Sequence, residues 1–269
     1  MNEFDVMKIE KWLGLILLSA FTLCTEAKPV HVAVAANFSK TMQSLVAEFE
    51  KTSDYEIALS FGSSGKFYAQ IKQGAPYELF FSADQAMPDA LQNEGLVMTA
   101  SRFTYAIGRL VVWSARSDFA KKIETKLKQG MFNKLAIANP KVAPYGTAAL
   151  QVLRHLDLID ATRAKWVRGA NISQTYQFVH TGNAELGFIA LSQVLGIHKT
   201  QQKTQKGSYW LVPHIMHSPI KQDVVLLSSA AKSHGARAFL DFIHTNKAQN
   251  IITQFGYLSS SSLNSEQSI

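Results

Sequence analysis

Four segments of the sequence carry neutral hydrogen-bond donors at points where an apolar run gives way to a helical pattern. They are residues 36–39, 61–66, 144–147 and 171–173. Their donors are the amide of Asn37 and the hydroxyls of Ser63, Ser64, Tyr145 and Ser173. A helix beginning at each point would add free backbone N–H groups and the positive end of its dipole. If the four segments converge away from water, they form a site for a small anion that needs no charged side chain.

Helix capping is the simpler explanation of any one of these segments. Asn and Ser are the commonest N-cap residues, so only convergence of several segments would make a binding site. Residues 62–66, Gly-Ser-Ser-Gly-Lys, do not form a nucleotide-binding P-loop. That motif needs Gly, four residues and then Gly-Lys-Ser/Thr, whereas Ser60 and Phe67 occupy the positions that would have to match.

The pattern of expected strands and helices around these donors indicates an α/β protein of two lobes. Short apolar runs that read as strands alternate with segments whose apolar residues recur every three or four positions. The expected strands are residues 30–35, 55–61, 79–81, 109–113, 134–138, 186–190 and 223–227. The expected helices are residues 38–49, 66–73, 87–94, 148–156, 173–180, 235–245 and 247–254, with an exposed loop at 199–208. In open sheets of this kind, ligands bind at the carboxyl ends of the strands.

The N-terminus is typical of a secretory signal peptide. Residues 12–24 are an uncharged apolar run, preceded by Lys8 and Lys11 and followed after two polar residues by Ala27, where we expect cleavage. The run is too short to cross the ~30 Å hydrocarbon layer as a helix. Removing residues 1–27 takes away two lysines and four acidic residues, so the formal net charge rises from +7 to +9. An exported basic protein attracts small anions, and the periplasm is the expected location.

Several other classes of function find no support in the sequence. The single cysteine excludes a disulfide framework, and the hydrolase and zinc-protease motifs Gly-x-Ser-x-Gly and His-Glu-x-x-His are absent. We interpret His214 and His217 as solvated loop residues and Asp84 as a lobe-spanning structural residue or a capping residue. No dense cluster of basic and aromatic residues indicates nucleic-acid binding.

Five stretches of the sequence resemble the periplasmic molybdate-binding proteins of ABC importers: residues 33–38, 60–66, 74–84, 139–146 and 255–257. The resemblance covers residues 29–258, and the Gly-Ala-Pro to Ser-Ala-Asp block at 74–84 is its most specific part. It implies a two-lobed periplasmic binding protein fold of type II. Each lobe would be a mostly parallel sheet flanked by helices, and the lobes would close about a hinge on an oxyanion.

The resemblance also implies the domain boundaries. The first lobe would comprise residues 28–108 and 219–258, and the second lobe residues 109–218, with the two crossing strands as the hinge. Residues 1–27 would be the signal peptide, and the Ser-rich residues 259–269 a flexible tail.

The family's anion contacts carry over to five positions. The first falls on Asn37, where many relatives have Ser, and the second on Ser64 with Ser63 beside it. The third falls on Tyr145, and the fourth, a backbone N–H contact, on Ile172. Some relatives instead place a tyrosine later in the chain, at the position that is Ala190 here. The four segments contain no Asp or Glu, which suits fully deprotonated dianions such as molybdate, tungstate and sulfate and disfavours hydrogen phosphate.

The resemblance therefore implies the substrate-binding component of an ABC importer, which delivers molybdate, and also tungstate, to a membrane permease. We expect a monomer without enzymatic activity, without a cofactor and without side chains that ligate a metal cation directly. Sulfate or a small organic anion stays open as an alternative ligand. Ferric iron would require several Tyr or His residues with carboxylates, of which only Tyr145 is well placed.

Overall fold

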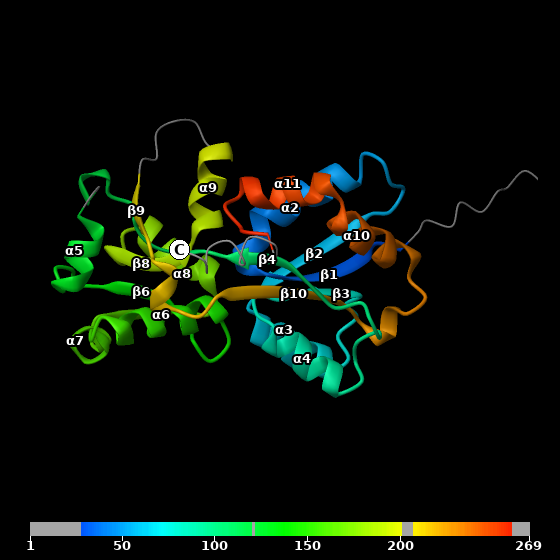
Figure 1. The fold of residues 1–269 in the computed structure, drawn as a ribbon, viewed down its shortest axis with the longest axis horizontal. Coiled ribbons are helices and arrows are strands. Elements are labelled where there is room, and N and C mark those ends of the chain that lie inside the picture. The colour runs from blue at the N-terminus through cyan, green and yellow to red at the C-terminus, as the bar shows by residue number, and fades with distance from the viewer. Residues whose placement is uncertain (1–27, 120–121, 201–206, 260–269) are drawn as a thin grey trace, which may run out of the picture.

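The computed structural model describes residues 28–119, 122–200 and 207–259 and shows two α/β lobes side by side along the long axis of the molecule (Figure 1). The predicted signal peptide lies outside the described residues, as do the centre of the predicted loop at 199–208 and all but the first residue of the predicted tail. None of the helices in the described ranges combines the length and the apolar character that a membrane crossing requires.

The first lobe is built on a five-stranded sheet with the order β2-β1-β3-β10-β4. Its strands are β1 (Val30–Ala35), β2 (Ile57–Gly62), β3 (Leu79–Phe81), β4 (Phe103–Gly108) and β10 (Ile220–Leu226). β1 pairs in parallel with β2 and β3, whereas β10 is antiparallel to both β3 and β4. The sheet is therefore mixed: β10 returns from the second lobe and runs against the other four strands.

Helices cover both faces of this sheet (Figure 1). One face packs against α2 (Ser39–Phe49), α10 (His234–His244) and α11 (Asn246–Gln254), around a core that includes Phe38 and Phe239. The other face packs against α3 (Ser64–Lys72) and α4 (Ala86–Asn93).

The second lobe has a five-stranded sheet with the order β7-β6-β8-β5-β9. Its strands are β5 (Leu110–Ser114), β6 (Leu135–Ala138), β7 (Trp166–Gly169), β8 (Leu186–Ala190) and β9 (Ser208–Leu211). β6 is parallel to β7 and β8, and β5 is antiparallel to β8 and β9. The flanking helices are α5 (Ile123–Lys128), α6 (Pro144–His155), α7 (Ile159–Arg163), α8 (Ile172–His180) and α9 (Leu191–Thr200).

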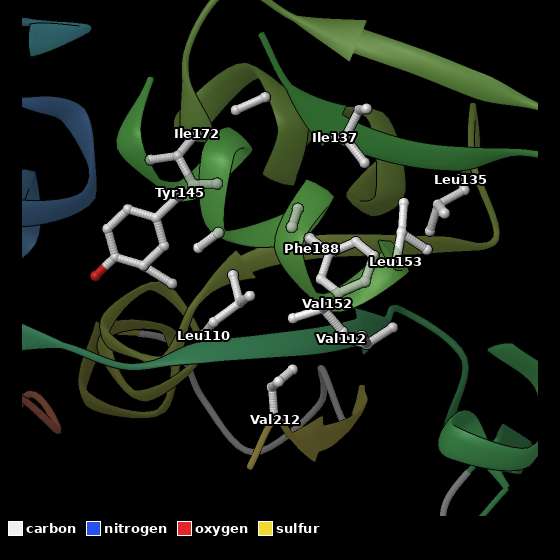
Figure 2. Packing of buried hydrophobic residues seen from close by; sticks show 14 of the residues in the cluster. Leu110, Val112, Leu135, Ile137, Tyr145, Val152, Leu153, Ile172, Phe188 and Val212 are labelled. Atoms are coloured by element: carbon white, nitrogen blue, oxygen red, sulfur yellow. The ribbon is translucent and has the colours of Figure 1, made fainter. Parts of the chain in front are cut away.

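Tyr145 lies at the rim of the core of the second lobe (Figure 2). Val112, Ile137, Phe188 and other apolar residues fill the space between the sheet and α6. Figure 2 shows the ring of Tyr145 at the edge of this cluster, with its hydroxyl oxygen directed away from the labelled aliphatic side chains. The cluster therefore anchors the Tyr145 ring and leaves its polar end free for other contacts.

The chain crosses between the two sheets twice. It passes from β4 to β5 through Arg109, and from β9 to β10 through the short helix η4 (His214–Met216). Three further 3-10 turns are η2 (Ala36–Phe38), η3 (Ser117–Phe119) and η5 (Ser228–Ala230).

The predicted elements are present, with shifted ends. The helix predicted from residue 66 begins at Ser64, and the one predicted from 148 begins at Pro144, so both donor segments are already helical. β4, β7, β9, α5, α7 and α9 were not predicted, because elements packed by distant neighbours can show little periodicity of their own. The predicted loop at 199–208 is narrower, since α9 continues to Thr200 and β9 begins at Ser208.

Candidate functional site

One small cavity is lined by residues from all four donor segments. Its lining includes Asn37, Ser63, Ser64, Tyr145 and Ile172, which are the five predicted contact residues. Each of these residues is at most 4% exposed. The structure thus brings together side chains from both lobes in one closed site.

The two sheets explain why the segments converge in pairs. In the first lobe β1 and β2 are parallel neighbours, and Ala35 pairs with Gly62 at their carboxyl ends. η2 and α3 therefore begin side by side. In the second lobe Ala138 pairs with Gly169 at the ends of β6 and β7, which places the starts of α6 and α8 next to each other. The two pairs of helix starts face the same cavity.

Helix N-termini supply much of the site's polarity. Ser64 is the first residue of α3, Ile172 the first of α8 and Tyr145 the second of α6. Backbone N–H groups in the first turn of a helix have no partner within that helix. Together with the positive ends of three helix dipoles, these groups favour a negative ligand.

Among the residues that the structure describes, none is a hydrogen-bond partner of the Ser63 hydroxyl. Ser63 stands at the N-cap of α3, but its side chain makes no capping bond, and its buried oxygen is unpartnered. Asn171 at the N-cap of α8 behaves differently, because its side chain accepts a 2.9 Å hydrogen bond from the backbone N–H of Gln174. Capping thus explains Asn171 but not Ser63. A buried polar group left unpaired is costly, and a ligand oxygen in the cavity would satisfy it.

Ser64 is held by a residue that the sequence did not single out for the site. The backbone N–H of Ala83 donates a 2.9 Å hydrogen bond to the Ser64 hydroxyl oxygen. Because that oxygen accepts, its own proton is available to donate to the cavity. Ala83 also lines the cavity and belongs to the 74–84 block, which was the available signal for it.

The Asn37 side chain points into a buried network instead of donating its amide to the cavity. Its Nδ2 donates to Gln222 Oε1 at 2.8 Å and to the Tyr257 hydroxyl at 3.0 Å. The prediction of an amide donor on Asn37 therefore differs from the observed arrangement. Asn37 is the second residue of η2, and a backbone N–H at this position has no partner within the turn.

Tyr145 is kept as a neutral phenol. Burial raises its pKa well above the ordinary value, an effect that the neighbouring amides of Gln222 and Asn37 oppose only in part. Gln222 Nε2 lies 3.4 Å from the phenol oxygen. The hydroxyl therefore keeps its proton at physiological pH and can act as a donor.

The cavity has neither a charged lining nor room for a large ligand. Its described lining residues include no Asp, Glu, Lys, Arg or His. The volume open to the centre of a water-sized sphere is only about 10 Å³. This arrangement can bind a small anion through neutral donors. It cannot accept a proton through a carboxylate.

Direct hydrogen bonds hold the lobes together around the site. The Ser173 hydroxyl donates to the carbonyl oxygen of Ala36 at 3.2 Å, and the Ser192 hydroxyl donates to that of Asn37 at 2.9 Å. Ser173, a predicted donor, is thus committed to an interlobe contact and does not line the cavity. The conformation is a closed one.

The remaining candidates have structural roles. Asp84 Oδ1 accepts from the backbone N–H of Met87 and from the Ser82 hydroxyl, both at 3.0 Å, which confirms the capping interpretation. His214 is exposed in η4, but His217 is half-buried and not simply solvated as predicted. Within the described ranges no group of three or more His, Cys, Asp or Glu residues could hold a metal ion.

A small, uncharged, closed cavity between two α/β lobes joined by crossing strands defines a two-lobed ligand-binding protein. The comparison with known families agrees with this class. The model of the bacterial extracellular solute-binding protein family matches residues 30–258, so the chain belongs to this family.

Curated relatives and solved structures support the assignment. The chain is 44% identical to the molybdate-binding protein ModA of Azotobacter vinelandii over 255 residues, 95% of this chain and 98% of the relative. It is 42% identical to ModA of Rhodobacter capsulatus, over 91% of this chain and 94% of the relative. The solved structure of the Azotobacter vinelandii periplasmic molybdate-binding protein matches with a TM-score of 0.79 and 39% identity, covering 86% of this chain and 99% of that one. The predicted two-lobed fold is confirmed.

Proposed function

We propose that this protein binds molybdate between its lobes and presents it to the permease of an ABC importer. The observation that carries the proposal is the unpartnered Ser63 hydroxyl in a closed cavity, with three helix N-termini around it and no charged residue in its lining. The molybdate-binding proteins named above, at 44% and 42% identity, support the choice of ligand.

The predicted contacts act as donors in this proposal. The hydroxyls of Ser63, Ser64 and Tyr145 and the backbone N–H groups of Asn37 and Ile172 surround the oxygens of the dianion. Fixed dipoles in a water-free cavity stabilise its charge without a cation. No cofactor takes part, since the anion is the cargo, and the protein performs no chemistry on it.

The size and the polarity of the cavity separate the possible ligands. A cavity this small favours a compact inorganic ion over an organic anion of many atoms. Hydrogen phosphate would bring a proton for which the lining holds no carboxylate acceptor. Tungstate and sulfate have the same charge and shape as molybdate, and we expect tungstate to bind as well.

Transport follows from closure of the lobes. The anion contacts residues of both lobes, so it favours the closed conformation by the contacts that exist only there. The closed monomer then docks on the membrane permease from the periplasm, to which the N-terminal segment directs it. Nucleic acid has no part in this role.

Calorimetric titration of the protein exported to the periplasm and purified from it tests the proposal. Molybdate and tungstate are expected to bind tightly and to raise the melting temperature by mass action, whereas phosphate is not. Binding of phosphate as tight as that of molybdate, or no binding of any tetrahedral oxyanion, would overturn it. Tighter binding of sulfate than of molybdate would change the ligand and keep the class.

A further inference from the structure

A buried hydrogen-bond network lies behind the cavity and centres on Gln222 of β10. Gln222 is fully buried. Its Oε1 accepts from Asn37 Nδ2 at 2.8 Å. It also lies 3.1 Å from the Tyr105 hydroxyl, whose single proton can go to it or to the Ser82 carbonyl oxygen at 3.0 Å. The Asn37 amide is thus the fixed donor at the carbonyl end of Gln222.

The other end of the same amide faces Tyr145. Gln222 Nε2 lies 3.4 Å from the Tyr145 hydroxyl oxygen and can only donate to it. Among the hydrogen bonds of the described residues, the Tyr145 hydroxyl takes part only as an acceptor. Its own proton is therefore left for the cavity that Tyr145 lines.

The rest of the network prevents Gln222 from turning over. The Tyr257 hydroxyl donates its one proton either to the backbone carbonyl of Asn37 or to the Ser192 hydroxyl, each at 2.9 Å, so its oxygen accepts from Asn37 Nδ2 at 3.0 Å. Asn37 must then also present Nδ2 to Gln222. A rotated Gln222 amide would place Nε2 against this nitrogen, donor against donor, in a site without water to separate them.

Gly108 makes the approach of Tyr145 possible. A Cβ atom at Gly108, the last residue of β4, would collide with the Tyr145 hydroxyl oxygen and would lie 2.7 Å from Gln222 Nε2. Gln222 and Gly108 belong to the first lobe and Tyr145 to the second. The contact between Gln222 and Tyr145 therefore crosses the lobes beside the hinge.

We infer that Gln222 is a positioning residue that aims the Tyr145 proton into the cavity and thereby makes the site selective for anions that need only donors. The inference rests on the proposed function. With Gln222 donating to it, the Tyr145 oxygen is a poor acceptor for the hydrogen bond that hydrogen phosphate would donate. With its own proton free, it donates to an oxygen of a bare dianion.

A double-mutant cycle on the full exported protein tests this role. Gln222→Met removes the donor and keeps the length of the side chain, and Tyr145→Phe removes the hydroxyl that it aims. The dissociation constants for molybdate and phosphate are measured by competition at one pH. Gln222→Met is expected to lower the preference for molybdate over phosphate by about 5-fold or more. In the Tyr145→Phe background it should have almost no effect.

The matched control pairs Gln222→Met with Ser63→Ala. Ser63 lines the same cavity, but it makes no hydrogen bond to Gln222 or to any other described residue. The effects of these two substitutions on affinity should therefore simply add. A general disturbance of the fold by Gln222→Met would instead couple to both partners.

Gln222→Glu provides an independent readout and serves if the Met variant does not fold. A carboxylate at this position accepts a hydrogen bond from the Tyr145 hydroxyl. The phenol proton then points away from the cavity, and the phenol oxygen faces the cavity as an acceptor. Molybdate affinity should fall and recover in part as the pH is lowered from 8 to 6, because a buried glutamate is protonated more readily. The unsubstituted protein should show no such recovery.

Equal effects of Gln222→Met with and without the Tyr145 hydroxyl would overturn the inference and leave the proposed function intact. A pH-independent loss in Gln222→Glu would do the same. Failure of the unsubstituted protein to bind any tetrahedral oxyanion would overturn both.

Discussion

The backbone N–H of Gly65 donates a 3.1 Å hydrogen bond to the carbonyl oxygen of Val142. Gly65 is in the first turn of α3 in the first lobe, and Val142 precedes α6 in the second lobe. This bond directly joins the two helix starts that carry Ser64 and Tyr145. The closed conformation therefore depends on an approach of two backbones beside the cavity.

Gly65→Ala should weaken ligand binding without weakening the fold. A Cβ atom at this position would lie 3.0 Å from Val142 Cα, which obstructs closure but leaves each lobe unchanged. Alanine is the better helix former, by up to about 1 kcal/mol, so the ligand-free protein should be as stable as before or more so. We expect molybdate affinity to fall about 10-fold or more in calorimetry. Unchanged affinity would show that ligand binding does not require the close approach of Gly65 to Val142.

Ser63→Ala should separate stability from binding. The Ser63 hydroxyl is buried and unpartnered, so its removal should leave the melting temperature of the ligand-free protein unchanged or raise it. Loss of a hydrogen bond to a charged ligand costs about 1.5–3 kcal/mol, which corresponds to about a 10- to 100-fold loss of affinity. Calorimetry and thermal unfolding measure the two effects.

Ser60→Ala is the matched control, because Ser60 is half-buried in the preceding strand β2 and does not line the cavity. It should leave the affinity unchanged. A loss of affinity in Ser60→Ala as large as in Ser63→Ala would argue against a direct contact by Ser63.

Binding should involve no net uptake or release of protons between pH 7 and pH 9. Burial keeps the pKa of Tyr145 well above its ordinary value near 10, so the phenol stays protonated through this range. Molybdate has no proton to lose there, and the described lining holds no other titratable side chain. Calorimetric titrations in buffers of different ionisation enthalpy should give the same binding enthalpy. A buffer-dependent enthalpy would place a titrating group in the site.

Asp84→Asn should stabilise the protein at neutral pH. Burial raises the pKa of Asp84 above its ordinary value of 3.8, and the nearby charge of Asp223 acts in the same direction. The ionised carboxylate is therefore a cost to the folded state at pH 7, and this cost disappears as the pH falls below the ordinary value. Asparagine keeps an oxygen to accept from Met87.

The melting temperature of Asp84→Asn should exceed that of the unsubstituted protein at pH 7, and the difference should shrink toward pH 4. Asp89→Asn is the control: Asp89 is exposed and paired with Arg102 at 2.7 Å, so its loss should change stability little. A lower melting temperature of Asp84→Asn at pH 7 would show that the charge itself is needed for capping.

Two exposed lysines between the lobes should speed the association of molybdate with the protein. Lys141 and Lys221 are exposed and line a cavity of about 440 Å³ between the lobes, adjacent to the closed site. Replacing both with Gln should lower the association rate for molybdate at low salt and leave the dissociation rate nearly unchanged. Stopped-flow measurements at two ionic strengths test this, since the difference should vanish at high salt. A change confined to the dissociation rate would contradict it.

The sequence by itself determined the local features of this protein. The 3.6-residue and two-residue periods predicted most helices and strands, because local periodicity reports which face of an element is buried. The same pattern placed Ser63, Ser64, Tyr145 and Ile172 at junctions between strand and helix, although it set the helix starts one to four residues too late. The Gly-Ala-Pro to Ser-Ala-Asp block pointed to the family.

Only the tertiary structure decided how these residues are used. Asn37 and Gln222 are 185 positions apart, and no local pattern could show that their amides meet or which way the Asn37 amide points. The same holds for the hydrogen bond from the Ala83 backbone to the Ser64 hydroxyl. It also holds for the unpartnered Ser63 hydroxyl, because the sequence alone cannot distinguish Ser63 from a capping serine. Hydrogen-bond direction depends on all neighbours at once, and those neighbours come together only when the two sheets pack and the lobes close.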